Sequence, residues 1–301
     1  IVGGAVRDEL LPNTPSSKDI DFLVRNLELN QIANTLSHLG KVKEVGQAFG
    51  VVTATIDGEE FDFAIPRTAE TKTGEKHTEF DVVTDPKAPI EADLGRRDFT
   101  INALAKDSNG NIIDLFGGQE DLQNRIIRAV GDPNERFRED PLRMLRAIQF
   151  ATRFDFDIEQ NTAKAIQKNI DKLASVSGER ILLEFEKAWT KGTANSARFI
   201  KLLLETGIGE SLFGFSFRPQ HIMAKDPVIG NFVAFFLNGG NYEKLKPTNE
   251  MIKYLELTRT AIKSGAPVHE YAGNQRDKLP LIADMVEQLG YENRASEIRD
   301  A

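Results

Sequence analysis

The chain of 301 residues contains no cysteine, and it has no apolar run near the ~18 residues that suggest a membrane-spanning helix. The lack of cysteine excludes disulfides and zinc–thiolate sites and favours a reducing, cytoplasmic setting. The lack of a long apolar run argues against a membrane protein. The chain opens on IVGG, without the basic and apolar parts of a secretory signal peptide. Because this opening resembles a strand already under way, we expect a few residues before Ile1 in the full protein.

A basic excess is also lacking, since the net charge is −8. Residues 1–180 hold 23 Lys and Arg against 31 Asp and Glu, whereas residues 181–301 hold 15 of each. Proteins that bind nucleic acid commonly show a basic excess. Any surface that binds RNA must therefore be local, and we expect most of the acidic residues to serve solubility.

Strand signals dominate the first part of the chain. Residues 19–24 and 51–56 are rich in β-branched or aromatic side chains, and residues 59–65 alternate between polar and apolar. Asp57 and Gly58 separate the last two segments and predict a two-residue hairpin turn.

Helical spacing appears between two of these strands and then dominates the rest of the chain. Residues 29–40 predict a helix, with Gly40 suited to the position after its end. After about residue 119 the strand signals fade. We therefore expect a mixed α/β head followed by an all-helical remainder. Helices are predicted at 141–154, 161–174, 178–189, 195–207, 249–265 and 279–290.

Two carboxylates in the first predicted strand suggest a metal site. Asp19 and Asp21 are two residues apart, so on a strand both side chains point to the same face. Such a pair can share divalent cations, and for oxygen ligands and phosphate substrates this usually means Mg²⁺. Asp62, in a later strand-like run, is a candidate third carboxylate. The alternatives are a solvated edge strand for the pair and a solvent-facing hairpin acid for Asp62.

A glycine turn precedes this pair. Gly3 and Gly4 follow an apolar strand end, and Arg7 lies in the first turn of the helical stretch that comes next. Glycines there let backbone N–H groups approach an anion, and a helix N-terminus favours negative charge. A Gly-Gly pair alone is more often a simple turn. Together with the two aspartates it describes a triphosphate site beside a metal site.

The segment DLGRRDFTINALA adds further polar residues at 93–105. Arg96 and Arg97 suit phosphates, whereas Asp98 and Asn102 suit ribose hydroxyls. The alternative for this segment alone is a charged helix start that Asp98 caps.

Five motifs, taken together, resemble one family. Their order and spacing are similar to those of the class II tRNA nucleotidyltransferases, which comprise the CCA-adding enzymes and their bacterial poly(A) polymerase relatives. The resemblance covers residues 1–190, and no His-Asp dyad of the phosphohydrolase kind follows it. The motifs are GGAVRD at 3–8, KDIDF at 18–22, RRDFTINALA at 96–105, GDPNERFREDPLRMLRAIQFATRF at 131–154 and SGERILLEFEKAW at 177–189.

The resemblance implies an α+β protein with three segments. Residues 1–131 correspond to a polymerase-β-like nucleotidyltransferase head with a mixed sheet. Residues 132–192 correspond to a helical neck that carries a nucleotide-selecting helix, and residues 193–301 to a helical body and tail that bind tRNA. Asp132 and Arg136 fall in the motif that the family places at the hinge between head and neck.

The resemblance also implies roles for single residues. Asp19 and Asp21 match the family's metal ligands. Several members carry a further arginine one turn after Arg146, where this chain has Gln149, so a fourth contact from this helix lacks its usual side chain. The nucleotide-binding positions that match are Gly3, Gly4, Arg7, Arg97, Asp98, Asn102, Asp140, Arg143 and Arg146.

Asp140 and Arg143 suit the selection of two bases. Adenine and cytosine each present an amino donor beside a ring-nitrogen acceptor, whereas guanine and uracil present the opposite order. An ionised Asp only accepts and an Arg only donates, so the pair matches C and A and opposes G and U. The alternative is that Pro141 begins a helix, Asp140 caps it, and the contact with Arg143 is a surface pair. Glu139 has the spacing to support Arg143 at i+4.

We therefore expect an enzyme that adds or repairs the 3′-terminal CCA of tRNA from CTP and ATP at a two-metal Mg²⁺ site. Within this class the alternatives are a poly(A) polymerase, against which the neutral C-terminal part argues, and an enzyme that adds only CC or only A. A non-catalytic RNA-binding relative is disfavoured because Asp19 and Asp21 are intact. A nucleotidyltransferase for a small molecule has no need of a base selector.

Overall fold

The computed structural model of the protein describes residues 1–12, 20–43, 50–72, 80–191, 196–214, 226–263 and 275–300. The chain forms two compact units. Unit 1 comprises Ile1–Arg143 and Phe156–Ile166, and unit 2 comprises Met144–Asp155 and Gln167–Ala301. None of the described helices is long and apolar enough to span a bilayer.

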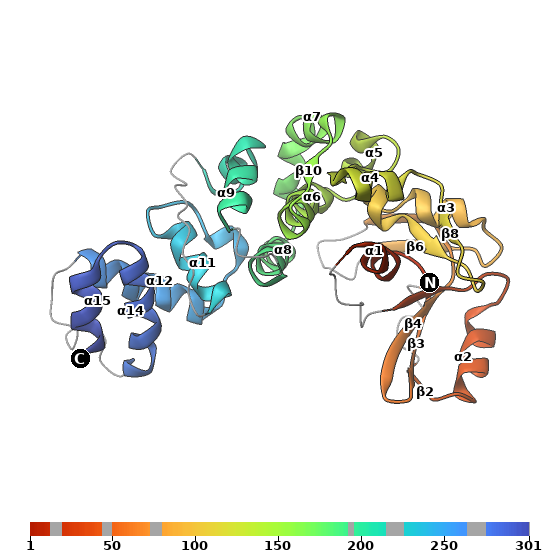
Figure 1. The fold of residues 1–301 in the computed structure, drawn as a ribbon, viewed down its shortest axis with the longest axis horizontal. Coiled ribbons are helices and arrows are strands. Elements are labelled where there is room, and N and C mark those ends of the chain that lie inside the picture. The colour runs from red at the N-terminus through yellow and green to blue at the C-terminus, as the bar shows by residue number, and fades with distance from the viewer. Residues whose placement is uncertain are drawn as a thin grey trace. The chain divides into compact units, whose positions relative to one another are not determined.

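Unit 1 is built on a mixed β-sheet, as the sequence predicts (Figure 1). The strand order is β1–β4–β3–β2, with β1 parallel to β4 and the other pairs antiparallel. These strands are β1 (Asp21–Leu23), β2 (Lys41–Lys43), β3 (Val51–Ile56) and β4 (Glu59–Ala64).

Val2 connects this sheet to a second strand pair. It forms antiparallel bridges to Asp21 of β1 and to Ala105 of β7 (Leu104–Lys106). Strand β7 in turn pairs with β8 (Ile112–Asp114). The residues that follow Val2 therefore begin next to the strand that carries Asp21.

The β3–β4 turn is the predicted two-residue hairpin. Asp57 and Gly58 both have positive φ, 52° and 85°, the combination that a type I′ turn requires. Such a turn matches the natural twist of the strands, and it fixes the register that sets Asp62 opposite Thr53.

Helix α2 (Leu29–Ser37) packs its apolar side against one face of the sheet (Figure 1). The position predicted for Gly40 is wrong by one residue, because His38 is the C-cap and the next residue is Leu39. A Cβ at residue 40 would lie 2.1 Å from the carbonyl oxygen of Thr55. Gly40 is therefore needed where the chain passes close to β3, rather than as the helix end.

The remaining elements of unit 1 are short. Strands β5 (Arg67–Lys72) and β6 (Phe80–Thr84) form an antiparallel pair, and β9 (Ile126–Ile127) runs parallel to β10 (Asp157–Ile158). Among the described residues, β9 and β10 are exceptions to the all-helical remainder predicted after about residue 119. The other helices are α1 (Gly4–Leu10), α3 (Ile90–Gly95), η2 (Thr100–Asn102), α4 (Gly118–Asn124) and α5 (Pro133–Glu139).

Unit 2 is helical and has an aromatic core. The ring of Phe185 meets those of Trp189, Phe199, Phe213 and Phe235 edge to face, with centroids 5.0–5.9 Å apart. Helices α6 (Leu142–Phe154) and α7 (Gln160–Asn169) contribute residues to both units. The helices that follow are η3 (Ile170–Ser175), α8 (Gly178–Lys191), α9 (Ser196–Glu205), α10 (Ile208–Phe213), α11 (Pro227–Phe236), η4 (Glu243–Leu245), α12 (Asn249–Lys263), η5 (Arg276–Lys278), α14 (Leu279–Gln288) and α15 (Glu292–Arg299).

Candidate active site

The glycine turn lies where the sheet meets α1. Gly3 has a φ of 73°, a value that L side chains rarely adopt, and α1 begins at Gly4. A Cβ on Gly3 would lie 2.5 Å from Nη1 of Arg97, and one on Gly4 would lie 3.4 Å from Nη2 of Arg7. Glycine at position 3 thus lets the guanidinium group of Arg97 lie directly against the backbone, whereas a Cβ at position 4 would make only an ordinary contact with Arg7.

Arg7 is buried and fixed by hydrogen bonds. Its Nε donates to Oδ1 of Asp8 at 2.7 Å, and its Nη1 donates to Oδ1 of Asn102. Its side chain is only 5% exposed. This contact joins α1 to η2, two elements that lie 95 residues apart in the sequence.

Arg97 is held by Asp93 of α3. Its Nη2 lies 3.1 Å from Oδ2 of Asp93, and Nη2 of Arg96 lies 3.0 Å from Oδ1 of the same carboxylate. Burial alone would raise the pKa of the Asp93 carboxyl, but the charges of Arg97 and Arg96 outweigh it, so the pKa lies below its ordinary value. Asp93 therefore stays ionised and orients both arginines, of which Arg97 lies against the glycine turn.

Asp98 and Asn102 are joined across the turn that contains η2. Oδ1 of Asp98 accepts hydrogen bonds from the backbone N–H of Phe99 at 2.8 Å and from Nδ2 of Asn102 at 2.9 Å. Since Asn102 also accepts from Arg7, its amide orientation is fixed from both ends. The structure thus brings Gly3, Gly4, Arg7, Arg97, Asp98 and Asn102 together.

Asp21 and Asp62 lie side by side on parallel strands. They are register partners, so both side chains project from the same face of the sheet, and both residues are exposed. The hydroxyl of Thr53 donates to Oδ1 of Asp62 at 2.5 Å. Asp19, the other predicted ligand, lies outside the described residues. No group of three potential ligands with metal-binding geometry occurs among the described residues.

This pair fits Mg²⁺ by its chemistry. Neighbouring strands lie about 4.8 Å apart, so two carboxylates in register can reach one ion. Mg²⁺ prefers oxygen ligands, and it is commonly bound by one or two carboxylates together with substrate phosphates. Asp21 and Asp62 offer such a donor set next to the turn formed by Gly3 and Gly4.

Glu139 connects two arginines at the junction of α5 and α6. Its Oε1 accepts from Nη2 of Arg136 at 2.6 Å, and its Oε2 accepts from Nη1 of Arg143 at 2.8 Å. The guanidinium groups also donate to backbone carbonyls, Arg136 to Gly95 and Arg143 to Arg96, both at 2.9 Å. The i+4 contact expected for Glu139 is confirmed, and it fixes Arg143 against the segment that carries Arg97.

Asp140 links the two helices. It is the C-cap of α5, and its Oδ1 accepts from the backbone N–H of Leu142 at 3.1 Å. This is the capping interaction considered above as the alternative to base selection. This hydrogen bond fixes the orientation of the Asp140 side chain. Asp132 caps α5 in the same way, through the N–H of Asn134 at 2.9 Å.

Arg146 belongs to unit 2, where its Nη1 lies 3.7 Å from Oε1 of Glu184. Lys187 donates to the same oxygen at 2.7 Å. Gln149, one turn further along, is buried, with 2% of its surface exposed.

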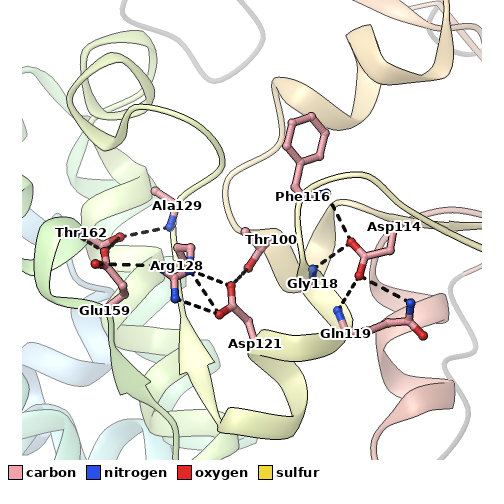
Figure 2. Close-up of polar contacts among 10 residues, drawn as sticks. All are labelled: Thr100, Asp114, Phe116, Gly118, Gln119, Asp121, Arg128, Ala129, Glu159 and Thr162. Carbon is pink, nitrogen blue, oxygen red and sulfur yellow. Dashed lines mark hydrogen bonds and ion pairs between the residues drawn. The ribbon is translucent and has the colours of Figure 1, made fainter.

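Sequence reasoning missed the residues that support the site. Asp93 lies in a segment that was singled out, and its i+3 and i+4 spacing to the two arginines was a usable signal. Asp121, Arg128 and Glu159 form a second network, which contacts η2 through Thr100 and to which no motif pointed (Figure 2).

Two family models match the chain. Residues 1–128 match the poly A polymerase head domain, and residues 155–220 match the probable RNA and SrmB-binding site of polymerase A. The CCA-adding enzyme of Pediococcus pentosaceus is 40% identical over 224 residues, which are 73% of this chain and 53% of that protein. The chain belongs to the tRNA nucleotidyltransferase and poly(A) polymerase family.

A second relative is similar over a somewhat smaller share of the chain. The CCA-adding enzyme of Enterococcus faecalis is 43% identical over 186 residues, 62% of this chain and 44% of that protein. The chain thus spans about half the length of the curated relatives it matches.

Solved structures of the family share the fold. The crystal structure of the Bacillus stearothermophilus CCA-adding enzyme in complex with CTP aligns with a TM-score of 0.72 at 28% identity, covering 99% of this chain and 76% of that one. The Thermotoga maritima CCA-adding enzyme complexed with tRNA aligns with a TM-score of 0.67 at 22% identity, covering 99% and 72%, and this likeness concerns the fold alone.

Proposed function

We propose that the chain catalyses template-independent addition or repair of the 3′-terminal CCA of tRNA, using CTP and ATP and releasing pyrophosphate. The observation that carries this proposal is the grouping of the glycine turn, Arg97, Asp98 and Asn102 beside the Asp21–Asp62 pair. The relatives named CCA-adding enzymes, one of them solved with CTP, support the same reaction.

In this proposal the head holds the triphosphate and the sugar. The N–H groups at the start of α1 and the guanidinium of Arg97 bind phosphates, while Arg7 fixes Asn102 from behind. Asp98 and Asn102 bind the ribose hydroxyls. Asp21, with Asp62 and Asp19, holds Mg²⁺, which when bound lowers the pKa of the RNA 3′-hydroxyl and stabilises the leaving pyrophosphate.

Asp140 and Arg143 select the base. Among the described residues, the contacts of Arg143 with Glu139 and with the carbonyls of Arg136 and Arg96 use three of its five N–H donors. Two donors are therefore left for the ring nitrogen of C or A, while Asp140 accepts from the amino group. Guanine and uracil would set donor against donor and acceptor against acceptor, and a site of this kind rejects them strongly.

The helical C-terminal part binds tRNA in this proposal. Its Lys and Arg balance its Asp and Glu at 15 each, so the contacts are expected to be local, directed to backbone and shape. Binding should weaken as salt rises, because counterions are released from the RNA. An affinity that does not change with salt would contradict a role in RNA binding. We also place the reaction in the cytoplasm.

One assay tests the proposal. Transcripts of tRNA that end before CCA, before CA and before A are each given CTP, ATP, both, or GTP with UTP. Full repair with CTP plus ATP is the expected result. No addition to any substrate by folded protein with Mg²⁺ would contradict it. Long A tails would favour a poly(A) polymerase, the second candidate, to which the name of the matched head-domain model points. Arrest after CC, or addition of A alone, would identify a partial enzyme.

A further inference from the structure

The turn that carries Asp98 and Asn102 is hydrogen-bonded to a separate segment of the chain, residues 128–130. The backbone N–H of Thr100 donates to the carbonyl of Arg128 at 2.9 Å, and the N–H of Val130 donates to the carbonyl of Asp98 at 3.2 Å. Phe99 and Ala129 therefore form an isolated antiparallel bridge between the two segments.

Side chains connect the same two segments a second time (Figure 2). The hydroxyl of Thr100 donates to Oδ2 of Asp121 at 2.6 Å, and both residues are buried, with 2% and 4% of their surface exposed. Arg128 donates to that carboxylate through Nε and Nη2, at 3.0–3.2 Å. Arg128 thus holds Thr100 through its own carbonyl and, by way of Asp121, through its side chain.

Arg128 and Ala129 are themselves held by further contacts. Nη1 of Arg128 lies 3.8 Å from Oε1 of Glu159, whose other oxygen accepts from the N–H and hydroxyl of Thr162 at 2.8 and 3.0 Å. The hydroxyl oxygen of Thr162 accepts from the N–H of Ala129 at 3.2 Å. On the other side, α4 starts so close to the turn that a Cβ on Gly118 would lie 2.3 Å from the carbonyl oxygen of Thr100.

We propose that Thr100, Asp121 and Arg128 are positioning residues that hold Asp98 and Asn102 in the conformation that recognises the ribose of the incoming nucleotide. None of the three needs to touch the nucleotide. Their contacts fix the backbone on either side of Phe99, and with it the hydrogen bond from Asn102 to Asp98. The inference rests on the proposed function, because it assigns the role of ribose recognition to this turn.

The test compares the binding of CTP and 2′-deoxy-CTP to the full chain by calorimetry at fixed Mg²⁺. Thr100→Val keeps the shape of the side chain and removes the donor, whereas Thr100→Ser keeps the donor. The wild type should prefer CTP. Thr100→Val and Asp121→Asn should reduce this preference about tenfold, the size of effect common for residues behind a binding group. Thr100→Ser should retain it.

A purely structural role would give a different pattern. Ile32→Val removes a methylene from the buried face of α2 and lowers the thermal midpoint without touching the turn. It should keep the full preference for CTP. If Thr100→Val lowers the midpoint like Ile32→Val but keeps the wild-type preference, the positioning role is wrong.

Two further results are possible: Thr100→Val does not fold, or the wild type shows no preference. If Thr100→Val does not fold, Arg128→Lys replaces it, because that side chain is 45% exposed and the lysine keeps the charge while losing the two-pronged contact. Its preference for CTP should also fall, and an unchanged preference would overturn the inference. If the wild type itself does not distinguish CTP from 2′-deoxy-CTP, the inference about this turn is wrong, whereas nucleotide addition is judged separately by the tRNA assay described above.

Discussion

In unit 1 the residues around Gly3 are joined by charged hydrogen bonds, such as those of Arg97 with Asp93 and of Arg7 with Asp8, whereas in unit 2 four aromatic rings surround Phe185. Charged groups lose much of their mutual attraction to the cost of leaving water, so they add little stability for each group buried. Aromatic rings gain stability directly from burial. The buried charged groups around Gly3 in unit 1 therefore serve orientation, and the buried aromatic rings of unit 2 serve stability.

The largest effect is expected from the aromatic core. Phe235 is fully buried against Phe185, Trp189 and Phe199, and Phe235→Ala should lower the free energy of unfolding by about 3–5 kcal/mol. Trp189 is the single tryptophan of the chain and lies in unit 2, so its fluorescence during urea denaturation reports this change. Leu204→Ala, at a residue 50% exposed, should change stability by less than about 0.5 kcal/mol. Equal losses in the two variants would contradict the account of unit 2.

The next largest effect is expected on the reaction rate, with the stability of the protein unchanged. Asp21→Asn should lower the rate of nucleotide addition by about 100-fold or more, since in the proposed mechanism it removes a charged metal ligand. Its thermal midpoint should stay close to that of the wild type, because residue 21 is exposed. Asp57→Asn, in the β3–β4 turn, is the matched control and should retain activity. A variant at 21 that adds nucleotides at the normal rate would exclude this carboxylate from the reaction.

A smaller effect is expected from Glu139→Gln. The change removes the charge that holds Arg136 and Arg143, and the preference for C and A over G and U should fall about fivefold, the size expected for a half-exposed charged contact. The comparison is made by single-nucleotide incorporation from each of the four triphosphates. Glu135→Gln, in the first turn of the same helix, serves as control. If both variants select bases equally well, Glu139 does not support the selector.

The smallest effect is a pH dependence of unit 1. The pKa of Asp93 is lowered in the folded protein, so its contribution to stability is complete above the ordinary value of 3.8 and is lost as the pH falls through the folded value. The wild type should therefore lose stability in acid more steeply than Asp93→Asn, which has no such group to protonate. Denaturation midpoints measured at a series of acidic pH values test this. Parallel curves for the two proteins would mean that Asp93 is not held as an ion.

The sequence predicts the local part of this structure well. The hairpin at Asp57 and Gly58, the strands on either side and most long helices follow from turn chemistry and apolar spacing, because these signals act over a few residues. The mixed sheet and the grouping of Arg97, Asp98 and Asn102 with the glycine turn agree with the family resemblance.

The supporting residues were not predictable in the same way. Arg128 meets Asp121 and Glu159, which are 7 and 31 positions away, and neither spacing carries a local signal. Gly40 was assigned to a helix end because glycine is common there, but the reason for it is the carbonyl of Thr55 on a neighbouring strand. The three-segment division and the roles of the nucleotide-binding residues remain predictions.

The most direct test of base selection by protein side chains is single-turnover nucleotide choice by Asp140→Asn. Asparagine caps helices as well as aspartate, so its amide oxygen can keep the bond to Leu142 while its NH₂ group takes the place of an acceptor. The account predicts a folded protein that binds triphosphate but no longer prefers CTP and ATP to GTP and UTP. A variant that still adds only C and A would contradict it, because the choice would then be made elsewhere.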